Sequence, residues 1–282
     1  MTRQKRVAAI HDISCFGRCS LTVALPIISA VGAECCVLPT AVLSTHTGGF
    51  TGFTYRDLTE DIAPIADHWK SLDLEFDAIY TGFLGSFEQL EIVSDFFERF
   101  GNDKNIILVD PVMADNGELY KIFGNDFPKG MRKLCERADI IIPNITEAAF
   151  MLGENYVEGP YEKVYIEGLL KKLSAFGCKK IVLTGTYFDD AELGAAAYDC
   201  ATGEIFYASA GRIEGYYHGT GDVFGSALLS ALLCGKDINR ATQIAVGFTV
   251  ESIARTKKAG TDVRFGVNFE AGLSRLINEV GK

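Results

Sequence analysis

The sequence lacks any long run of apolar residues. A helix that crosses a membrane needs about 20 such residues in succession, and no stretch of this chain approaches that length. The apolar run nearest the N-terminus covers only residues 7–10, which is too short for the core of a secretory signal peptide. We therefore expect a cytoplasmic protein with no membrane partner.

The chain also lacks paired cysteines and an excess of basic residues. Its eight cysteines include no CxxC pair and no Cys/His group at the spacing of a zinc site. They are expected to be scattered, buried thiols in a reducing compartment. The formal net charge of −10 argues against broad binding of nucleic acid.

Signatures of several enzyme classes are missing as well. The phosphate-binding pattern GxxxxGK[ST] does not occur, so the chain is not a P-loop protein. The patterns GxSxG and HExxH are also absent, and nothing therefore supports a hydrolase or a metalloprotease.

What the chain does contain is a regular alternation of short apolar runs and longer helical patterns. The runs are apolar throughout, as expected when helices cover both faces of a sheet. This order predicts a single α/β domain over residues 1–282, a three-layer αβα sandwich with a mostly parallel, doubly wound central sheet. A hairpin is expected where residues 194–199 and 204–207 flank a short turn. The expected strands are residues 7–10, 35–38, 78–80, 106–109, 140–142 and 181–183, and the expected helices are residues 21–31, 87–100, 161–176, 223–234 and 239–257.

Small and polar residues follow most of these strands. In open α/β sheets the carboxyl edge of the strands is where ligands bind, so residues after several strands are expected to share one cleft. The pairs that follow the first, third, fourth, fifth and sixth strands are His11-Asp12, Thr81-Gly82, Asp110-Pro111, Pro143-Asn144 and Thr184-Gly185.

Residues 218–228 read HGTGDVFGSAL. The glycines give GxGxxxG, one residue longer than the dinucleotide fingerprint and late in the chain, which disfavours a Rossmann dehydrogenase. The following apolar run predicts a buried helix, whose first N–H groups and partial positive charge suit an anion. Asp222 would then lie beside that anion, placed to take a proton from a hydroxyl. Spacing alone is equally consistent with an Asp222 that only caps the first turn.

Three further segments each allow two interpretations. In PNITEAAF, residues 143–150, Asn144 and Glu147 have the spacing of a capping box, but they could also hold the waters of a Mg²⁺ ion. In DPVMADNG, residues 110–117, Asp110 is either a loop cap or a site residue. STHTGGFTGFTY, residues 44–55, is either a mobile flap or an ordinary surface loop, and its His46 has no partner at metal-ligand spacing.

Taken in order along the chain, these segments resemble one family. They resemble the ribokinase-like superfamily, and within it the vitamin B6 kinase branch. The segments that carry the resemblance are IHDISCFGRCS, STHTGGF, YTGFLGS, DPVMADNGELY, PNITEAAF, VLTGT and GTGDVFGSAL. The resemblance runs from about residue 6 to residue 257, and a late GTGD before a helix is its most specific part. It implies a ribokinase-like homodimer that uses ATP and Mg²⁺ to phosphorylate the 5′-hydroxymethyl group of pyridoxal, pyridoxamine or pyridoxine. It leaves the use of a monovalent cation such as K⁺ open.

The resemblance also implies the roles of single residues. Asp222 is the general base, and the backbone amides of Gly219, Thr220 and Gly221 form the anion hole for the transferring phosphate. The residues that serve ATP are Asp110, Asn144, Glu147, Thr184 and Tyr120, of which Asp110 and Glu147 also serve the metal. The residues beside the pyridine ring are Asp12, His46, Thr47, Phe83 and Asp222.

Departures from the family pattern put the substrate in doubt. Asp12 stands where many pyridoxal kinases have Ser, Phe83 where Tyr is usual, and Ala114-Asp115 where Gly-Asp is usual. Hydroxymethylpyrimidine kinases share the fold and a similar ring substrate, so they are the first alternative. A sugar or nucleoside kinase and a catalytically silent B6-binding protein are further alternatives, the last disfavoured by the intact GTGD.

Asp12 suggests a substrate preference. A carboxylate near the ring would pair with the 4′-ammonium group of pyridoxamine, which pyridoxal lacks. The alternative is that Asp12 only caps the end of its strand.

Overall fold

The computed structural model describes residues 3–281, which are built around one nine-stranded sheet. The strand order is β11-β10-β9-β8-β5-β4-β1-β2-β3, and neighbours from β9 to β2 run parallel, whereas β3, β10 and β11 pair antiparallel. The strands are β1 (Arg6–Phe16), β2 (Glu34–Thr45), β3 (Tyr55–Asp57), β4 (Ala78–Thr81), β5 (Ile106–Val109), β8 (Ile140–Ile141), β9 (Lys180–Thr186), β10 (Glu192–Asp199) and β11 (Glu204–Gly211). A separate small hairpin is formed by β6 (Ala114–Asp115) and β7 (Glu118–Leu119).

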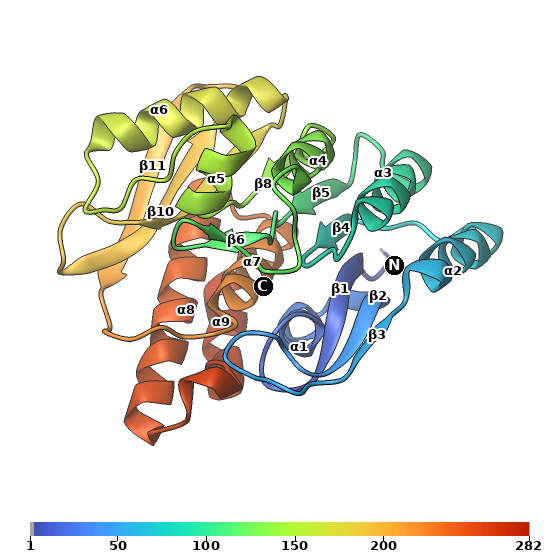
Figure 1. The fold of residues 1–282 in the computed structure, drawn as a ribbon. Helices are drawn as coiled ribbons and strands as arrows, with labels where there is room; N and C mark the ends of the chain where they lie inside the picture. The colour runs from blue at the N-terminus through green and yellow to red at the C-terminus, as the bar shows by residue number, and fades with distance from the viewer. Residues whose placement is uncertain (1–2, 282) are drawn as a thin grey trace.

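Helices cover both faces of the sheet (Figure 1). One face packs against α2 (Thr59–Ser71), α3 (Phe87–Phe100), α4 (Phe127–Cys135), α5 (Ile145–Leu152) and α6 (Lys163–Leu173). The other packs against α1 (Leu21–Ala30), α7 (Thr220–Leu233), α8 (Ile238–Ala259) and α9 (Leu273–Val280). Successive strand residues alternate between the two cores, as Ile79 and Tyr80 do on β4. The predicted three-layer sandwich with a mostly parallel sheet is therefore confirmed, together with the hairpin of β10 and β11.

Four helices lie outside the predicted set, namely α2, α4, α5 and α9. Pro64 lies inside α2, and α4 carries Pro128 and Gly130, residues that lower helix propensity and hide the helical pattern. Both helices form because one side of each packs on the sheet, where Ile62 and Met131 are buried. Tertiary packing thus overrides local preference at these positions.

The first two strands are longer than their apolar runs predict. β1 continues to Phe16 beside β2, with an irregularity between His11 and Ile13, so Asp12 lies within the strand and not after it. Thr184-Gly185 also lies inside a strand, β9. The prediction that both pairs follow their strands is therefore wrong, because pairing with a neighbouring strand keeps polar residues extended as readily as apolar ones.

The expectation of scattered, buried thiols is wrong for five of the eight cysteines. Cys19, Cys135 and Cys178 are buried, but Cys15 is exposed, and Cys35, Cys36, Cys200 and Cys234 are partly exposed. The adjacent cysteines on β2 reach solvent because the strand beyond β2 is the three-residue β3, which covers little of it.

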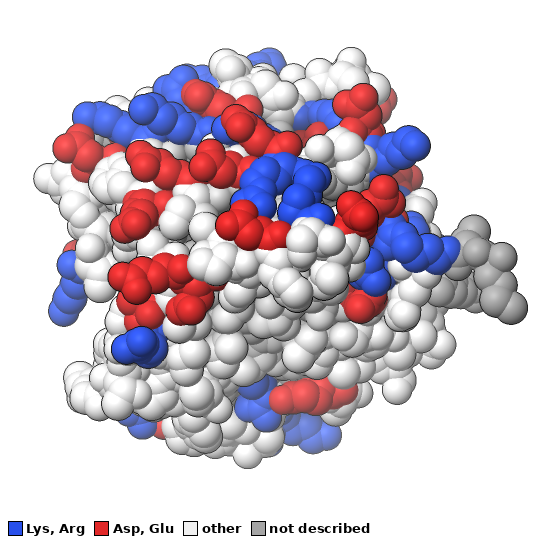
Figure 2. All heavy atoms as spheres, turned by 90° about the vertical axis from the view of Figure 1, so that its right-hand side faces the viewer, with Lys and Arg blue, Asp and Glu red and all other residues white. Residues whose placement is uncertain are grey.

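Charge is unevenly distributed over the molecule. Residues 19–55 contain a single Asp, Glu, Lys or Arg, which is Glu34. Figure 2 shows correspondingly few charged side chains on the lower part of the face near β1, β2 and β3, whereas the upper part carries many of both signs. Among residues 3–281, no helix has the length and apolar character that a membrane span requires.

Candidate active site

The start of α7 is the centre of the site. Gly219, the residue before the helix, has a φ of +74°, and a Cβ there would collide with the carbonyl oxygen of Arg18. Glycine is therefore required at this position both by conformation and by close approach. A Cβ on Gly221 would meet nothing within 4 Å in the described chain, so the space beside the first turn is open. The first N–H groups of the helix, which have no intrahelical partner, can bind an anion there.

Asp222 lies in that first turn and is partly exposed. Burial is the main reason that the pKa of its carboxyl group is raised to about 7. The nearby backbone N–H of Ser20 opposes this rise, and the charge of Asp12 adds to it. A carboxylate with a pKa near neutrality is suited to accept a proton during a reaction.

Asp12 is 4% exposed and faces the same region from the irregularity in β1. Its carboxylate accepts hydrogen bonds from Ser20 Oγ at 2.5 Å and from Ser14 Oγ at 3.3 Å. Burial raises its pKa, and the two serine hydroxyls oppose that shift. The interpretation of Asp12 as a strand-end cap is therefore wrong, because the residue is inside the strand and bonds side chains instead.

Asp110 and Glu147 form a second, deeper pair of carboxylates. Both are buried, and their pKa values lie well above the usual range because of burial and of other carboxylates, with Asp222 acting on Asp110 and Asp110 acting on Glu147. Within residues 3–281 no Lys or Arg contributes to either shift. Two buried acids without a basic partner are stabilised in their charged form by a bound cation.

Glu147 also completes a capping box at the start of α5. Its carboxylate accepts a hydrogen bond from Asn144 N at 2.9 Å, and Asn144 Oδ1 accepts one from Glu147 N at 2.9 Å. The other carboxylate oxygen accepts a hydrogen bond from Met113 N at 3.2 Å. The capping interpretation is thus confirmed, and the same geometry fixes Glu147 beside Asp110.

The residues expected to line the nucleotide lie next to this pair. Asn144 bridges to Thr184 in the sheet, and its side-chain amide donates to Ala114 O at 2.8 Å. Tyr120 is hydrogen-bonded to Asp115, and burial raises the pKa of the Tyr120 hydroxyl. These contacts bring the ends of β6, β8 and β9 together on one side of Asp110.

The segment of residues 46–50 is held by its histidine. His46 Nδ1 accepts a hydrogen bond from Gly48 N at 3.1 Å, so Nε2 carries the proton and donates to Arg264 O at 2.6 Å. Burial lowers the pKa of His46, which keeps the ring neutral. Its ring lies 4.9 Å from that of His218, the residue before Gly219, whereas Thr47 is exposed. The segment therefore packs against the start of α7. That it is a mobile flap stays a prediction.

Phe83 lies in the loop that follows β4. It is half-buried, and its ring centroid is 5.8 Å from that of Phe123. Its carbonyl oxygen accepts a hydrogen bond from Thr40 Oγ1 at 3.2 Å, which fixes the loop after β4 to β2.

The structure brings the four predicted acids into one electrostatic chain, from Asp12 through Asp222 and Asp110 to Glu147. Sequence reasoning missed several of their neighbours, which are Ser20, Asp115, Tyr216 and His218. Tyr216 Oη donates to Asp115 Oδ2 at 2.8 Å and ties the loop before α7 to the β6–β7 hairpin. The aromatic run YYHGTGD was the available signal for Tyr216 and His218, because these rings directly precede the glycine turn.

Comparison with known proteins matches this chain to one family over most of its length. The model of the phosphomethylpyrimidine kinase family covers residues 25–266. The chain belongs to this family. It is therefore a kinase of the pyridoxal and hydroxymethylpyrimidine group, and the resemblance to ribokinase-like B6 kinases is confirmed.

Relatives in the family carry names for two substrates. A Bacteroides thetaiotaomicron protein described as a phosphomethylpyrimidine kinase, in a crystal form with pyridoxal, is 38% identical with a TM-score of 0.93, covering 97% of this chain and 96% of that one. The pyridoxal kinase of Lactobacillus plantarum is 31% identical with a TM-score of 0.89, over 97% and 96%. A hydroxymethylpyrimidine/phosphomethylpyrimidine kinase of Aquifex aeolicus is 30% identical over 193 residues, 67% of this chain and 71% of that protein.

Proposed function

We propose that this family member transfers the γ-phosphate of ATP to the 5′-hydroxymethyl group of vitamin B6, meaning pyridoxal, pyridoxamine and pyridoxine. The observation that carries the proposal is the start of α7, where Asp222 stands beside an open helix N-terminus. A phosphoryl-transfer site needs an anion-binding cradle and a base within reach of the attacking hydroxyl, and the first turn of α7 carries groups suited to both roles.

The chemistry follows from that arrangement. The hydroxyl oxygen of the substrate bonds to the γ-phosphorus as the bond from phosphorus to the β–γ bridging oxygen breaks, and the hydroxyl proton passes to a carboxylate oxygen of Asp222. The backbone N–H groups of Gly219, Thr220 and Gly221 hold the phosphoryl oxygens during the transfer. ADP leaves with the negative charge of the broken bond.

The deep acids Asp110 and Glu147 fit a bound Mg²⁺. Their oxygen donors are the type that Mg²⁺ prefers, and no basic side chain in the described chain neutralises them. Across residues 3–281 no group of three or more His, Cys, Asp or Glu side chains is gathered for metal binding. That is expected for Mg²⁺, which keeps several waters and takes further ligands from phosphates. When bound, the ion would neutralise the charge of the phosphate groups.

The choice of a pyridine substrate rests on the substrate side of the site. The rings of His46 and Phe83 and the carboxylate of Asp12 are proposed to contact the pyridine ring. The relative from Bacteroides thetaiotaomicron, which was crystallised with pyridoxal, supports this choice of substrate. We place pyridoxamine first among the B6 compounds, because the Asp12 carboxylate would pair with its ammonium group. The protein is further proposed to be a cytoplasmic homodimer.

A hydroxymethylpyrimidine kinase is the second candidate. The name of the matching family and the relative from Aquifex aeolicus favour it. The same helix start, base and carboxylate pair would serve that reaction, so only the substrate side separates the two candidates.

Substitution of the base tests the proposed chemistry. Asp222→Asn is expected to lower kcat by about 100-fold or more, since the proton acceptor is lost. The variant should still bind ATP, and its Tm should equal or exceed that of the wild type because a poorly solvated carboxylate is removed. Asp237→Asn is the matched control, since it makes the same change at the start of α8, where Asn caps equally well. Near-wild-type turnover in Asp222→Asn would refute the assignment.

A further inference from the structure

Ser20 has a backbone conformation that serine rarely adopts. Its φ is +55° and its ψ is −128°, a combination that glycine enters freely and that a Cβ disfavours. Outliers of this kind persist only where the surrounding structure holds them, and they gather at functional sites.

Ser20 also gives up the usual role of a serine before a helix. It immediately precedes α1, where a serine hydroxyl normally accepts a hydrogen bond from the first turn. In the described structure its side chain makes no such capping bond, and its hydroxyl donates to Asp12 instead. Its backbone N–H lies close enough to the Asp222 carboxyl group to lower the pKa of that group. One residue in a strained conformation therefore contacts two carboxylates of the site.

Neighbouring contacts hold the segment in place. The carbonyl oxygen of Ser20 accepts hydrogen bonds from Val23 N at 3.0 Å and Ala24 N at 2.9 Å, which start α1. Arg18 N donates to Phe265 O at 3.0 Å, and the carbonyl of Arg18 lies against Gly219. The segment of residues 18–20 is thus held between α1 and the glycine turn of α7.

We propose that Ser20 is a positioning residue that sets Asp222 and Asp12 relative to each other, so that the base meets the hydroxyl of a ring held next to Asp12. The inference rests on the proposed function, because it takes Asp222 as the base. Ser20 itself touches no reacting atom. Its strained backbone directs the N–H toward the Asp222 carboxylate, and its hydroxyl donates a hydrogen bond to the Asp12 carboxylate at 2.5 Å.

Two substitutions separate a positioning role from a structural one. Ser20→Gly removes the hydroxyl and releases the strain, so its Tm should equal or exceed that of the wild type. Its kcat for ADP release with pyridoxal should fall about tenfold or more, as expected for a misplaced base, with the KM for ATP unchanged. Ser20→Ala loses the hydroxyl but keeps the Cβ, so its kcat should also fall and its Tm should lie below that of Ser20→Gly.

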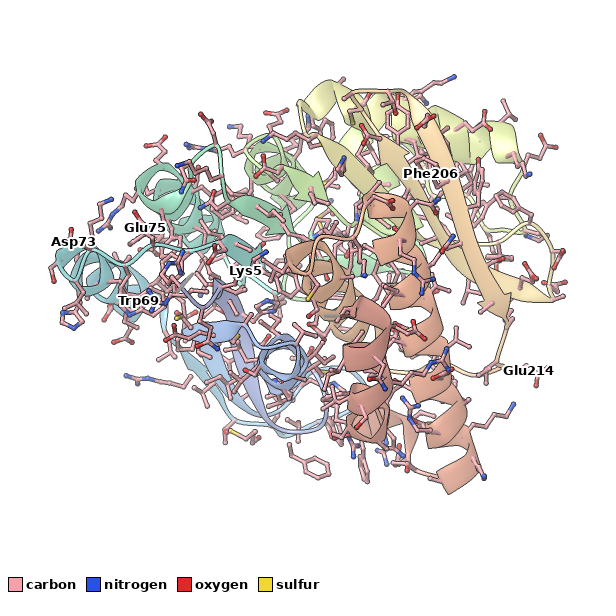
Figure 3. All side chains as sticks on the ribbon, turned by 180° about the vertical axis from the view of Figure 1, so that it is seen from behind. Lys5, Trp69, Asp73, Glu75, Phe206 and Glu214 are labelled. Carbon is pink, nitrogen blue, oxygen red and sulfur yellow. The ribbon has the colours of Figure 1, made fainter. Side chains whose placement is uncertain are left out.

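Asp73→Gly is the matched control for the release of strain. Asp73 has a φ of +53° in the turn after α2, at the edge of the molecule in Figure 3, and we expect its replacement to leave kcat unchanged. Wild-type kcat in Ser20→Gly would overturn the inference and leave the proposed function standing. So would a Tm of Ser20→Gly far below that of the wild type, because Ser20 would then hold the fold. A wild type that releases no ADP with any ring alcohol would instead refute the proposed function, while the Tm comparison would still test the strain.

Discussion

At the scale of single residues, Asp222 joins two properties that rarely occur together in an aspartate. It stands at a helix start, where a negative charge is favoured, and it is packed closely enough that its pKa rises to about 7. The balance between these effects leaves a carboxyl group that changes charge near neutral pH. The rate of the proposed reaction should therefore depend on pH near neutrality.

The value of kcat/KM is predicted to rise with pH up to about 7 and then level off, because only the ionised Asp222 accepts a proton. The folded pKa lies above the ordinary value of 3.8, so the protonated form is favoured in the fold, and its contribution to stability is lost as the pH rises from 3.8 to about 7. Initial rates measured across this range test the point. An acid limb at the ordinary aspartate value would contradict it.

Asp12 is predicted to control the choice between pyridoxamine and pyridoxal. A charge-assisted hydrogen bond contributes about 1.5–3 kcal/mol, so Asp12→Ser should lower the ratio of the two kcat/KM values by about tenfold or more. Ser20 and Ser14 remain to bond the new hydroxyl, which limits the structural damage. The idea fails if the ratio is the same in the variant and the wild type.

At the scale of elements, α7 can approach the sheet because of Gly225. A Cβ at this position would collide with Tyr80 Oη and come within 2.8 Å of Ile142 Cδ1, both on buried residues. The third glycine of the motif thus serves helix packing, whereas Gly219 serves the turn and Gly221 is proposed to leave room for the anion.

Gly225→Ala is predicted to destabilise the protein by about 1–3 kcal/mol through overpacking. Adding Tyr80→Phe should recover part of the loss, because it removes the nearest atom. Gly168→Ala in α6 is the control, since a Cβ there meets nothing within 4 Å among the described residues and alanine favours helix by about 1 kcal/mol. Denaturant unfolding of the four proteins measures these differences, and an unaltered midpoint for Gly225→Ala would disprove the packing account.

Helices and strands could be predicted from the sequence where a local pattern of apolar residues determines them. The apolar runs locate β4 and β5 well, because both strands are buried on both faces. The pattern fails at β1, whose polar second half is held by pairing with β2, and at α4, whose helix depends on packing. The acids of the site follow from strand ends, a helix start and the family resemblance. Ser20 could not be found in this way, because its strained backbone depends on contacts with a distant turn.

At the scale of the whole molecule, the uneven distribution of charge predicts which surface forms the interface between two copies of the chain. Each chain carries a formal charge of −10, so two copies repel except where charge is sparse. The exposed residues of segment 19–55 contribute such a surface, and among them Leu25 on α1 is 41% exposed. We predict a homodimer that buries this region. Sedimentation analysis measures the mass, and a monomer at all concentrations would contradict the prediction.

A panel of substrates tests whether this molecule is a B6 kinase. ADP release would be measured with ATP and Mg²⁺ on pyridoxal, pyridoxamine, pyridoxine and hydroxymethylpyrimidine in parallel. We expect turnover of all three B6 compounds, with the highest kcat/KM for pyridoxamine and a lower value for the pyrimidine. Turnover of hydroxymethylpyrimidine alone, or of none of the four, would contradict it.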